Sequence, residues 1–181
     1  ISDNTIQELV KGCFQMGKAK TGALICIEGN IPLKDYVESG IAVDAVVTGA
    51  LLINIFEKNT PLHDGAVIIQ NDRVTAATCY LPLSDSKKIN KDLGTRHRAA
   101  IGLSESTDAL VIVVSEETGA VSVARGGKLK HNLSREKLFE EIHNFQNSFV
   151  VKVDKNTQAD LKRDWPTKAL SLITAVLLWV I

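Results

Sequence analysis

Two short polar segments, about thirty residues apart in apolar sequence, contain the residue types that phosphate and metal chemistry requires. Residues 62–66 read Leu-His-Asp-Gly-Ala, and residues 94–100 read Gly-Thr-Arg-His-Arg-Ala-Ala. A carboxylate, imidazoles and two guanidiniums at the ends of buried elements are costly unless they are paired or used. These two segments are therefore the first candidates for a functional site.

The second segment has the features of an anion-binding helix start. Thr95 is expected to cap a helix that runs to about Glu105, which leaves backbone N–H groups free at the positive end of the helix. Arg96 and Arg98 in the first turn oppose the helix dipole unless an anion binds there. With a bound anion, guanidiniums and N–H groups converge on phosphate oxygens. A solvated basic turn paired with nearby carboxylates remains the alternative.

The first segment lies where a loop enters an expected strand. Asp64 at this point can hold a divalent cation or accept a proton from a hydroxyl. Gly65 permits a ligand to approach the backbone closely. The alternative is an Asx turn that opens a hairpin, and His63 by itself is typical of a structural, hydrogen-bonded histidine.

A third polar segment, Ser-Glu-Glu at residues 115–117, follows the most apolar of the expected strands. Ligands often bind at strand ends in sheet proteins, and carboxylates there can complete a metal site. A simple polar turn is the alternative, and the following Thr118 and Gly119 favour it.

The elements that must position these segments form a mixed α/β pattern. Apolar runs joined mostly by hairpins predict strands, and amphipathic stretches between them predict helices. The expected fold is therefore a central mixed, largely antiparallel sheet covered by helices on both sides. Residues 31–49 are ambiguous. Helices are expected after Ser2 or Asp3, over residues 50–56, from Thr95 to about Glu105 and from Ser134 through Phe145. Strands are expected over residues 23–27, 66–70, 74–81, 110–114 and 120–124.

Composition limits the classes of partner. The 181 residues include 21 basic and 21 acidic side chains, so there is no bulk positive charge to hold nucleic acid, and none is expected as a partner. The three cysteines do not form a metal-binding pattern. Cys26 and Cys79 lie in apolar runs and are expected to be buried thiols in a reducing compartment.

The C-terminal part differs from the rest. We expect a catalytic domain over residues 1–150, a charged linker over 151–168 and an apolar tail over 169–181. The tail has 13 residues without a charge, whereas a membrane span needs about 20, so the tail is at most the start of a membrane helix. A helix packed on the domain is the alternative.

Together, the three segments resemble the diadenylate cyclase domain, the bacterial family that makes the second messenger cyclic di-AMP. The resemblance covers the chain from about Thr5 to about Phe145. The Asp-Gly-Ala hallmark of the family is present at residues 64–66, and its Arg-His-Arg hallmark at residues 96–98. The strand, the Leu-Pro loop and the Gly-Thr pair between the hallmarks also fit, as does Ser-Glu-Glu.

The membrane-anchored class of these cyclases is the most similar. In that class the anchoring helices precede the catalytic domain, so a start at Ile1 is expected to be a truncation after them. The resemblance implies that the catalytic domain lies at the cytoplasmic face of the cell membrane. Membrane association would come from such N-terminal helices or from the tail.

The resemblance also implies a reaction. Each domain would hold one ATP, and two domains would face each other as a homodimer. Each ATP 3′-hydroxyl would attack the α-phosphate of the other ATP and expel pyrophosphate. Asp64 would be a metal ligand or the proton acceptor, while Arg96 and Arg98 would act on the phosphates. Mg²⁺ or Mn²⁺ would bridge phosphate oxygens, with Glu116 and His63 as further ligands. The residues that would contact the nucleotide are Gly65, Ala66, Leu81, Thr95, Arg96, His97 and Ser115, with the backbone near Leu81 at the adenine edge.

Two other functions remain open at this level. One is an adenine-nucleotide sensor without turnover, which could dispense with the acidic residue. The other is a metal-dependent nucleotide phosphohydrolase that acts as a monomer. The products formed from ATP distinguish the cyclase from both.

Overall fold

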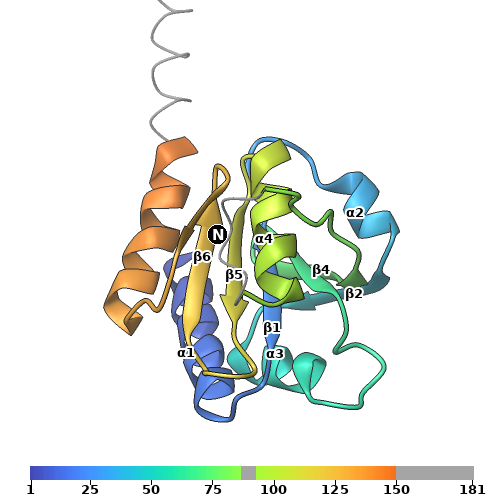
Figure 1. The fold of residues 1–181 in the computed structure, drawn as a ribbon, viewed down its shortest axis with the longest axis vertical. Helices are drawn as coiled ribbons and strands as arrows, with labels where there is room; N and C mark the ends of the chain where they lie inside the picture. The colour runs from blue at the N-terminus through green and yellow to red at the C-terminus, as the bar shows by residue number, and fades with distance from the viewer. Residues whose placement is uncertain (87–92, 150–181) are drawn as a thin grey trace, which may run out of the picture. The chain divides into compact units, whose positions relative to one another are not determined.

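A seven-stranded sheet forms the centre of the part of the chain that the computed structural model describes, residues 1–86 and 93–149 (Figure 1). The order across the sheet is β2-β4-β3-β1-β5-β6-β7. Along the chain the strands are β1 (Ala23–Ile27), β2 (Ile41–Val46), β3 (Ala66–Gln70), β4 (Arg73–Cys79), β5 (Leu110–Val114), β6 (Val121–Arg125) and β7 (Lys128–Lys130).

The pairing of β1 determines which strand ends meet. This strand is parallel to β3, with Ile25 opposite Val67, and antiparallel to β5, with Ala23 opposite Val114. One end of the strands therefore holds the starts of β1 and β3 and the end of β5. This end of the sheet is called the site edge. All five residues of β1 are buried, as expected of a central strand with both faces covered.

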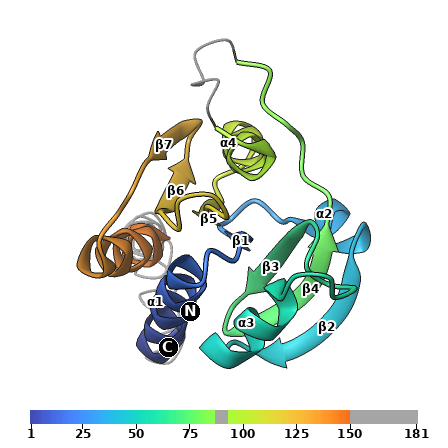
Figure 2. The same ribbon diagram turned by 60° about the horizontal axis from the view of Figure 1, so that its bottom comes forward.

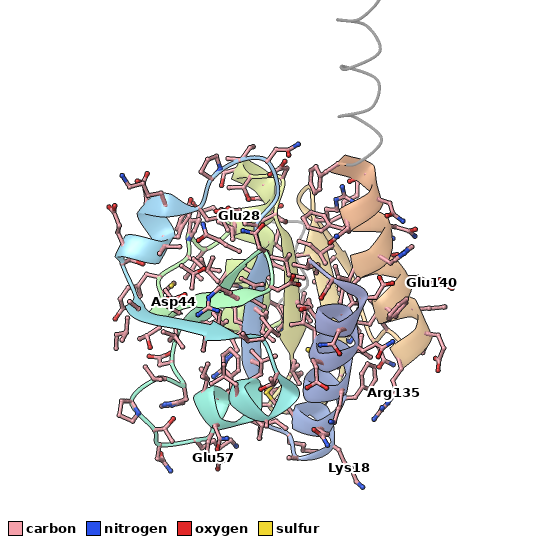
Figure 3. All side chains as sticks on the ribbon, turned by 180° about the vertical axis from the view of Figure 1, so that it is seen from behind. Lys18, Glu28, Asp44, Glu57, Arg135 and Glu140 are labelled. Carbon is pink, nitrogen blue, oxygen red and sulfur yellow. The ribbon has the colours of Figure 1, made fainter. Side chains whose placement is uncertain are left out.

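Helices cover both faces of the sheet. Helix α4 (Thr95–Ser106) packs on β5 and β6, and α1 (Asp3–Lys18) lies on the opposite side of these strands (Figure 2). Helix α3 (Gly49–Phe56) contacts α1, and Figure 3 shows both in front of the strands when the molecule is seen from behind. The short α2 (Lys34–Glu38) lies against β4 and the edge strand β2.

Each helix buries the face that its sequence pattern predicts. In α1, Ile6, Leu9, Cys13 and Met16 recur at helical spacing and are buried. The Ser2 side chain caps this helix by accepting a hydrogen bond from the Thr5 N–H, as predicted. A last helix spans residues 135–149, and within it the side chains of Leu138, Ile142 and Phe145 are buried.

The expected fold class is confirmed, and so is the hairpin of β3 and β4. The strand predicted over residues 74–81 ends earlier, at Cys79, because the Tyr80 N–H donates to Ser39 Oγ and leaves the strand ladder. Helix α2 and strand β2 occupy much of the stretch that the sequence left ambiguous, residues 31–49.

Cys13, Cys26 and Cys79 are free and buried, in agreement with the expectation for Cys26 and Cys79. Burial raises the pKa of the Cys13 thiol to about 12, which keeps it protonated. No helix among residues 1–86 and 93–149 is long and apolar enough to cross a membrane. The predicted linker over 151–168 and tail over 169–181 lie outside the described residues.

Candidate active site

A pocket of about 370 Å³ opens at the site edge, beside the end of β5. This volume is within the roughly 300–1,000 Å³ of small-molecule sites. The first turn of α4, the turn after β5 and the residue that follows β7 form its walls. The lining residues are Leu93, Gly94, Thr95, Arg96, His97, Val114, Ser115, Glu116, Glu117, Thr118 and His131.

The start of α4 faces this pocket without a side-chain cap. The prediction that Thr95 caps the helix is wrong, because Gly94 is the N-cap residue and Thr95 is the first helical residue. Gly94 has no side chain to accept a hydrogen bond, so no side chain caps the first-turn N–H groups. These groups and the helix dipole make this end of α4 a potential anion site.

Arg96 and Glu116 form an ion pair at the pocket. Arg96 Nη1 lies 3.0 Å from Glu116 Oε2, with side-chain exposures of 24% and 51%. The sequence suggested separate roles for these residues, in phosphate binding and in metal binding. The structure brings them together, so an incoming phosphate would compete with the Glu116 carboxylate for the guanidinium.

Ser115 shapes the turn that carries Glu116. Its hydroxyl oxygen accepts hydrogen bonds from the backbone N–H groups of Glu117 and Thr118, at 3.3 and 3.2 Å. Its own N–H donates to the Ala120 carbonyl oxygen, at 3.0 Å. These hydrogen bonds give Ser115 a structural role, because they shape the turn that places the two glutamates at the pocket.

His97 lies in the pocket wall and is 6% exposed. Its Nε2 is buried and has no hydrogen-bond partner among the described residues. Burial lowers the pKa of His97, nearby His131 lowers it further, and Glu117 partly opposes both effects. His97 is therefore held in its neutral form.

His131 is a pocket residue that sequence reasoning missed. Its ring centroid lies 6.2 Å from that of His97, and its Nδ1 is 3.0 Å from Ser122 Oγ. It belongs to none of the three polar segments and reaches the pocket because it follows β7, which pairs with β6.

Asp64 lies at the site edge but does not line the pocket. β1 separates β3 from β5, so Asp64 is offset from the end of β5 by two strand spacings, about 10 Å. Its carboxylate is exposed and accepts a hydrogen bond from the Gly65 N–H, at 3.0 Å. His63 Nδ1 lies 2.6 Å from the Thr60 carbonyl oxygen, to which it donates, and Nε2 is left for another partner.

Gly65 is required by the fold itself. Its φ is +89°, and an added Cβ would lie 2.9 Å from the backbone carbon of Thr78 on the neighbouring strand. Glycine is therefore needed for this conformation and for close packing against β4, whatever ligand binds.

The predicted nucleotide-contact residues Gly65, Ala66 and Leu81 lie outside the pocket lining, and so does the predicted catalytic residue Arg98. Arg98 is two positions from Arg96 on α4, which is about 200° around the helix. The two side chains therefore project from different sides of α4. The Ala66 side chain is fully buried in β3. Leu81 is partly buried and packs against the core cluster. Their roles with a nucleotide stay predictions.

The predicted roles of Asp64, Glu116 and His63 as metal ligands stay predictions. The described residues contain no group of three or more His, Cys, Asp or Glu side chains that could hold a metal ion. Instead, two carboxylates with exposed oxygens, Asp64 and Glu116, lie at one edge of the sheet. This arrangement suits a cation such as Mg²⁺, which often takes one or two protein carboxylates together with phosphate oxygens.

The comparisons with known proteins assign this chain to a family. A sequence model of the DAC family, described as "DisA bacterial checkpoint controller nucleotide-binding", matches residues 10–129. The cyclic di-AMP synthase CdaA of Bacillus subtilis is 50% identical over 161 residues, which cover 89% of this chain and 56% of that protein. The chain belongs to the diadenylate cyclase family.

Other members of the diadenylate cyclase family are also similar to this chain. A diadenylate cyclase of Listeria monocytogenes is 51% identical over 133 residues, covering 74% of this chain and 49% of that protein. The chain thus spans about half the length of these two curated relatives. A crystal structure of a double mutant of DacA from Staphylococcus aureus superimposes with a TM-score of 0.77. It is 50% identical and covers 78% of this chain and 95% of its own.

The diadenylate cyclase match contains every pocket residue except His131, which lies two residues beyond residue 129. Motif reasoning could therefore identify most of the pocket, whereas no family motif pointed to His131.

Proposed function

We propose that this chain is the catalytic part of a diadenylate cyclase that converts two ATP into cyclic di-AMP and two pyrophosphates. One observation carries the proposal. The start of α4, without a side-chain cap, opens with Arg96 into a pocket, and the Asp64 carboxylate lies at the same edge of the sheet. Anion-binding donors and an acidic residue are the groups that phosphoryl transfer needs.

In this proposal the phosphates of ATP bind at the start of α4. The N–H groups of the first turn, with Thr95 and Arg96, donate to phosphate oxygens, and the guanidinium exchanges its Glu116 partner for phosphate. Arg98 stabilises negative charge that develops during the reaction. The remaining nucleotide contacts come from Ser115 and His97 in the pocket, from the backbone of Gly65 and Ala66, and from the backbone near Leu81 at the adenine edge.

The bond changes are an in-line displacement. The 3′-hydroxyl oxygen of one ATP forms a bond to the α-phosphorus of the other. The bond from that phosphorus to the bridging oxygen of the β-phosphate breaks, and pyrophosphate leaves. Asp64 accepts the hydroxyl proton, and its exposed carboxylate is open to a substrate. A second, identical displacement closes the ring of cyclic di-AMP.

Two chains must face each other in this reaction, because each pocket holds one ATP and the two nucleotides attack each other. The position of Asp64 supports this arrangement. It lies about 10 Å from the end of β5, outside the pocket of its own chain, where it can meet a nucleotide that another chain presents.

The family's reaction is metal-dependent, and we propose Mg²⁺ or Mn²⁺ here. Glu116 would hold the ion on the phosphates of the nucleotide bound by its own chain, and Asp64 with the Nε2 of His63 would approach it from the facing chain. The bound ion would supply Lewis-acid stabilisation of the charge on the phosphates. We further propose that the catalytic part works at the cytoplasmic face of the membrane, where ATP is available, and that the apolar residues 169–181 contact lipid.

The test is the product formed by the full chain from ATP and Mn²⁺, identified by its mass. The proposal expects cyclic di-AMP, with two pyrophosphates per molecule. It also expects specific activity to rise with protein concentration in the dilute range, because the active species is a dimer. Release of inorganic phosphate with ADP or AMP would instead support a phosphohydrolase. ATP binding without turnover would support a sensor.

A further inference from the structure

Gly22, at the start of β1, has no side chain, and the Arg96 side chain lies in the space that a side chain there would take. An added Cβ there would lie 2.6 Å from Arg96 Nη1, 2.8 Å from Arg96 Cζ and 3.1 Å from Glu116 Cβ. The guanidinium of Arg96 therefore occupies the space that any other residue at position 22 would fill.

Backbone conformation does not explain this glycine. Positive φ angles occur at four described glycines, and Gly22 is not one of them. An alanine could adopt the backbone of Gly22, which is buried beside the site edge. What an added Cβ at this position would disturb is the close approach of the Arg96 side chain, whose guanidinium would have to move.

The ion pair that this space permits contributes little to stability. Arg96 and Glu116 are 24% and 51% exposed, and solvent screens the attraction in such partly exposed pairs. Their placement matters for a different reason. An arginine side chain has many rotamers, and a guanidinium that is already held beside the start of α4 loses less freedom when it binds a phosphate.

We propose that Gly22 is a positioning residue for the phosphate site. It acts through Arg96, whose guanidinium it allows to lie between the start of β1 and the turn after β5. This inference rests on the proposed function, because it takes the ligand of Arg96 to be the phosphates of ATP.

The experiment compares Gly22→Ala with the wild type and with Thr21→Ala, a change in the same loop. Thr21 binds the Met16 carbonyl oxygen only through its backbone N–H, which alanine keeps. Binding of α,β-methylene-ATP with Mn²⁺ is measured by calorimetry, since this analogue resists cleavage of the α–β bond. Gly22→Ala should lower its affinity about tenfold or more, as expected for a lost charge-assisted contact. Thr21→Ala should bind like the wild type.

A double-mutant cycle separates positioning from a general structural effect. In an Arg96→Ala background, Gly22→Ala should change the affinity by less than about twofold, because its partner is already absent. An equal loss in both backgrounds would overturn the inference. So would a Gly22→Ala variant that binds within about twofold of the wild type.

The inference about Gly22 and the proposed function can be refuted by different results. A wild-type chain that binds the analogue but makes no cyclic di-AMP would refute the cyclase, while the affinity comparison would still test Gly22. A wild-type chain that makes cyclic di-AMP and a Gly22→Ala variant of unchanged affinity would refute only the inference.

Discussion

Replacing Asp64 with asparagine should stop catalysis and leave the fold intact. The change removes a charge and keeps the shape of the side chain. Asp64 is exposed, and its hydrogen bond from the Gly65 N–H can also be accepted by an asparagine oxygen. The free energy of unfolding should therefore change by less than about 0.5 kcal/mol, as for most surface substitutions. This corresponds to a shift in melting temperature of about 2 °C or less.

The effect on turnover should be much larger. Loss of a group that acts only in the transition state typically costs about 10²-fold or more in kcat, or about 2.7 kcal/mol in the barrier. Binding of ATP should remain measurable, because Asp64 lies outside the pocket that binds the phosphates. The rate of cyclic di-AMP formation and the binding of α,β-methylene-ATP, measured on the same preparation, separate these two effects.

Asp3→Asn is the matched control, since it makes the same chemical change on an exposed residue. Asp3 begins α1, whose 16 residues span about 24 Å and end near the site edge, so Asp3 lies far from the chemistry. This variant should keep full turnover. Turnover of Asp64→Asn within about tenfold of the wild type would refute the catalytic role of Asp64. A large fall in its melting temperature would show that the residue is structural.

Five further changes test other parts of the molecule. Arg96→Ala and Arg98→Ala should each weaken ATP binding or turnover without lowering the melting temperature, because removal of a first-turn cation relieves repulsion from the helix dipole. Lower melting temperatures with intact activity would contradict this. Gly102→Ala should lower the free energy of unfolding by about 1–3 kcal/mol in urea titrations, because an added Cβ would overlap a carbonyl oxygen of the loop after β4. The pKa of His97 is lowered in the folded state, so the unfolded chain binds a proton first as the pH falls. The melting temperature should therefore decrease below about pH 6.5, and less so in His97→Gln. Deletion of residues 169–181 should abolish binding to liposomes and keep the melting temperature, whereas a large decrease would show that this segment belongs to the fold.

The sequence by itself determined the local elements and the main polar segments. The hairpin of β3 and β4, helix α3 and the central strand β5 follow from apolar periodicity and turn residues, which act over a few neighbouring positions. The hallmarks at residues 64–66 and 96–98 are contiguous, so they could be recognised without a fold. The cap of α4 was the local error, because Thr95 has the right chemistry for a cap that Gly94 occupies.

Only the tertiary structure decided which of these groups meet. The insertion of β1 between β3 and β5 brings Gly22 against the Arg96–Glu116 pair and leaves Asp64 outside the pocket. His131, which follows β7, lies in the pocket wall because β7 pairs with β6. Strand order depends on hydrogen bonds between segments that are far apart in sequence. Periodicity along one segment specifies that it is a strand, but not which strand pairs beside it.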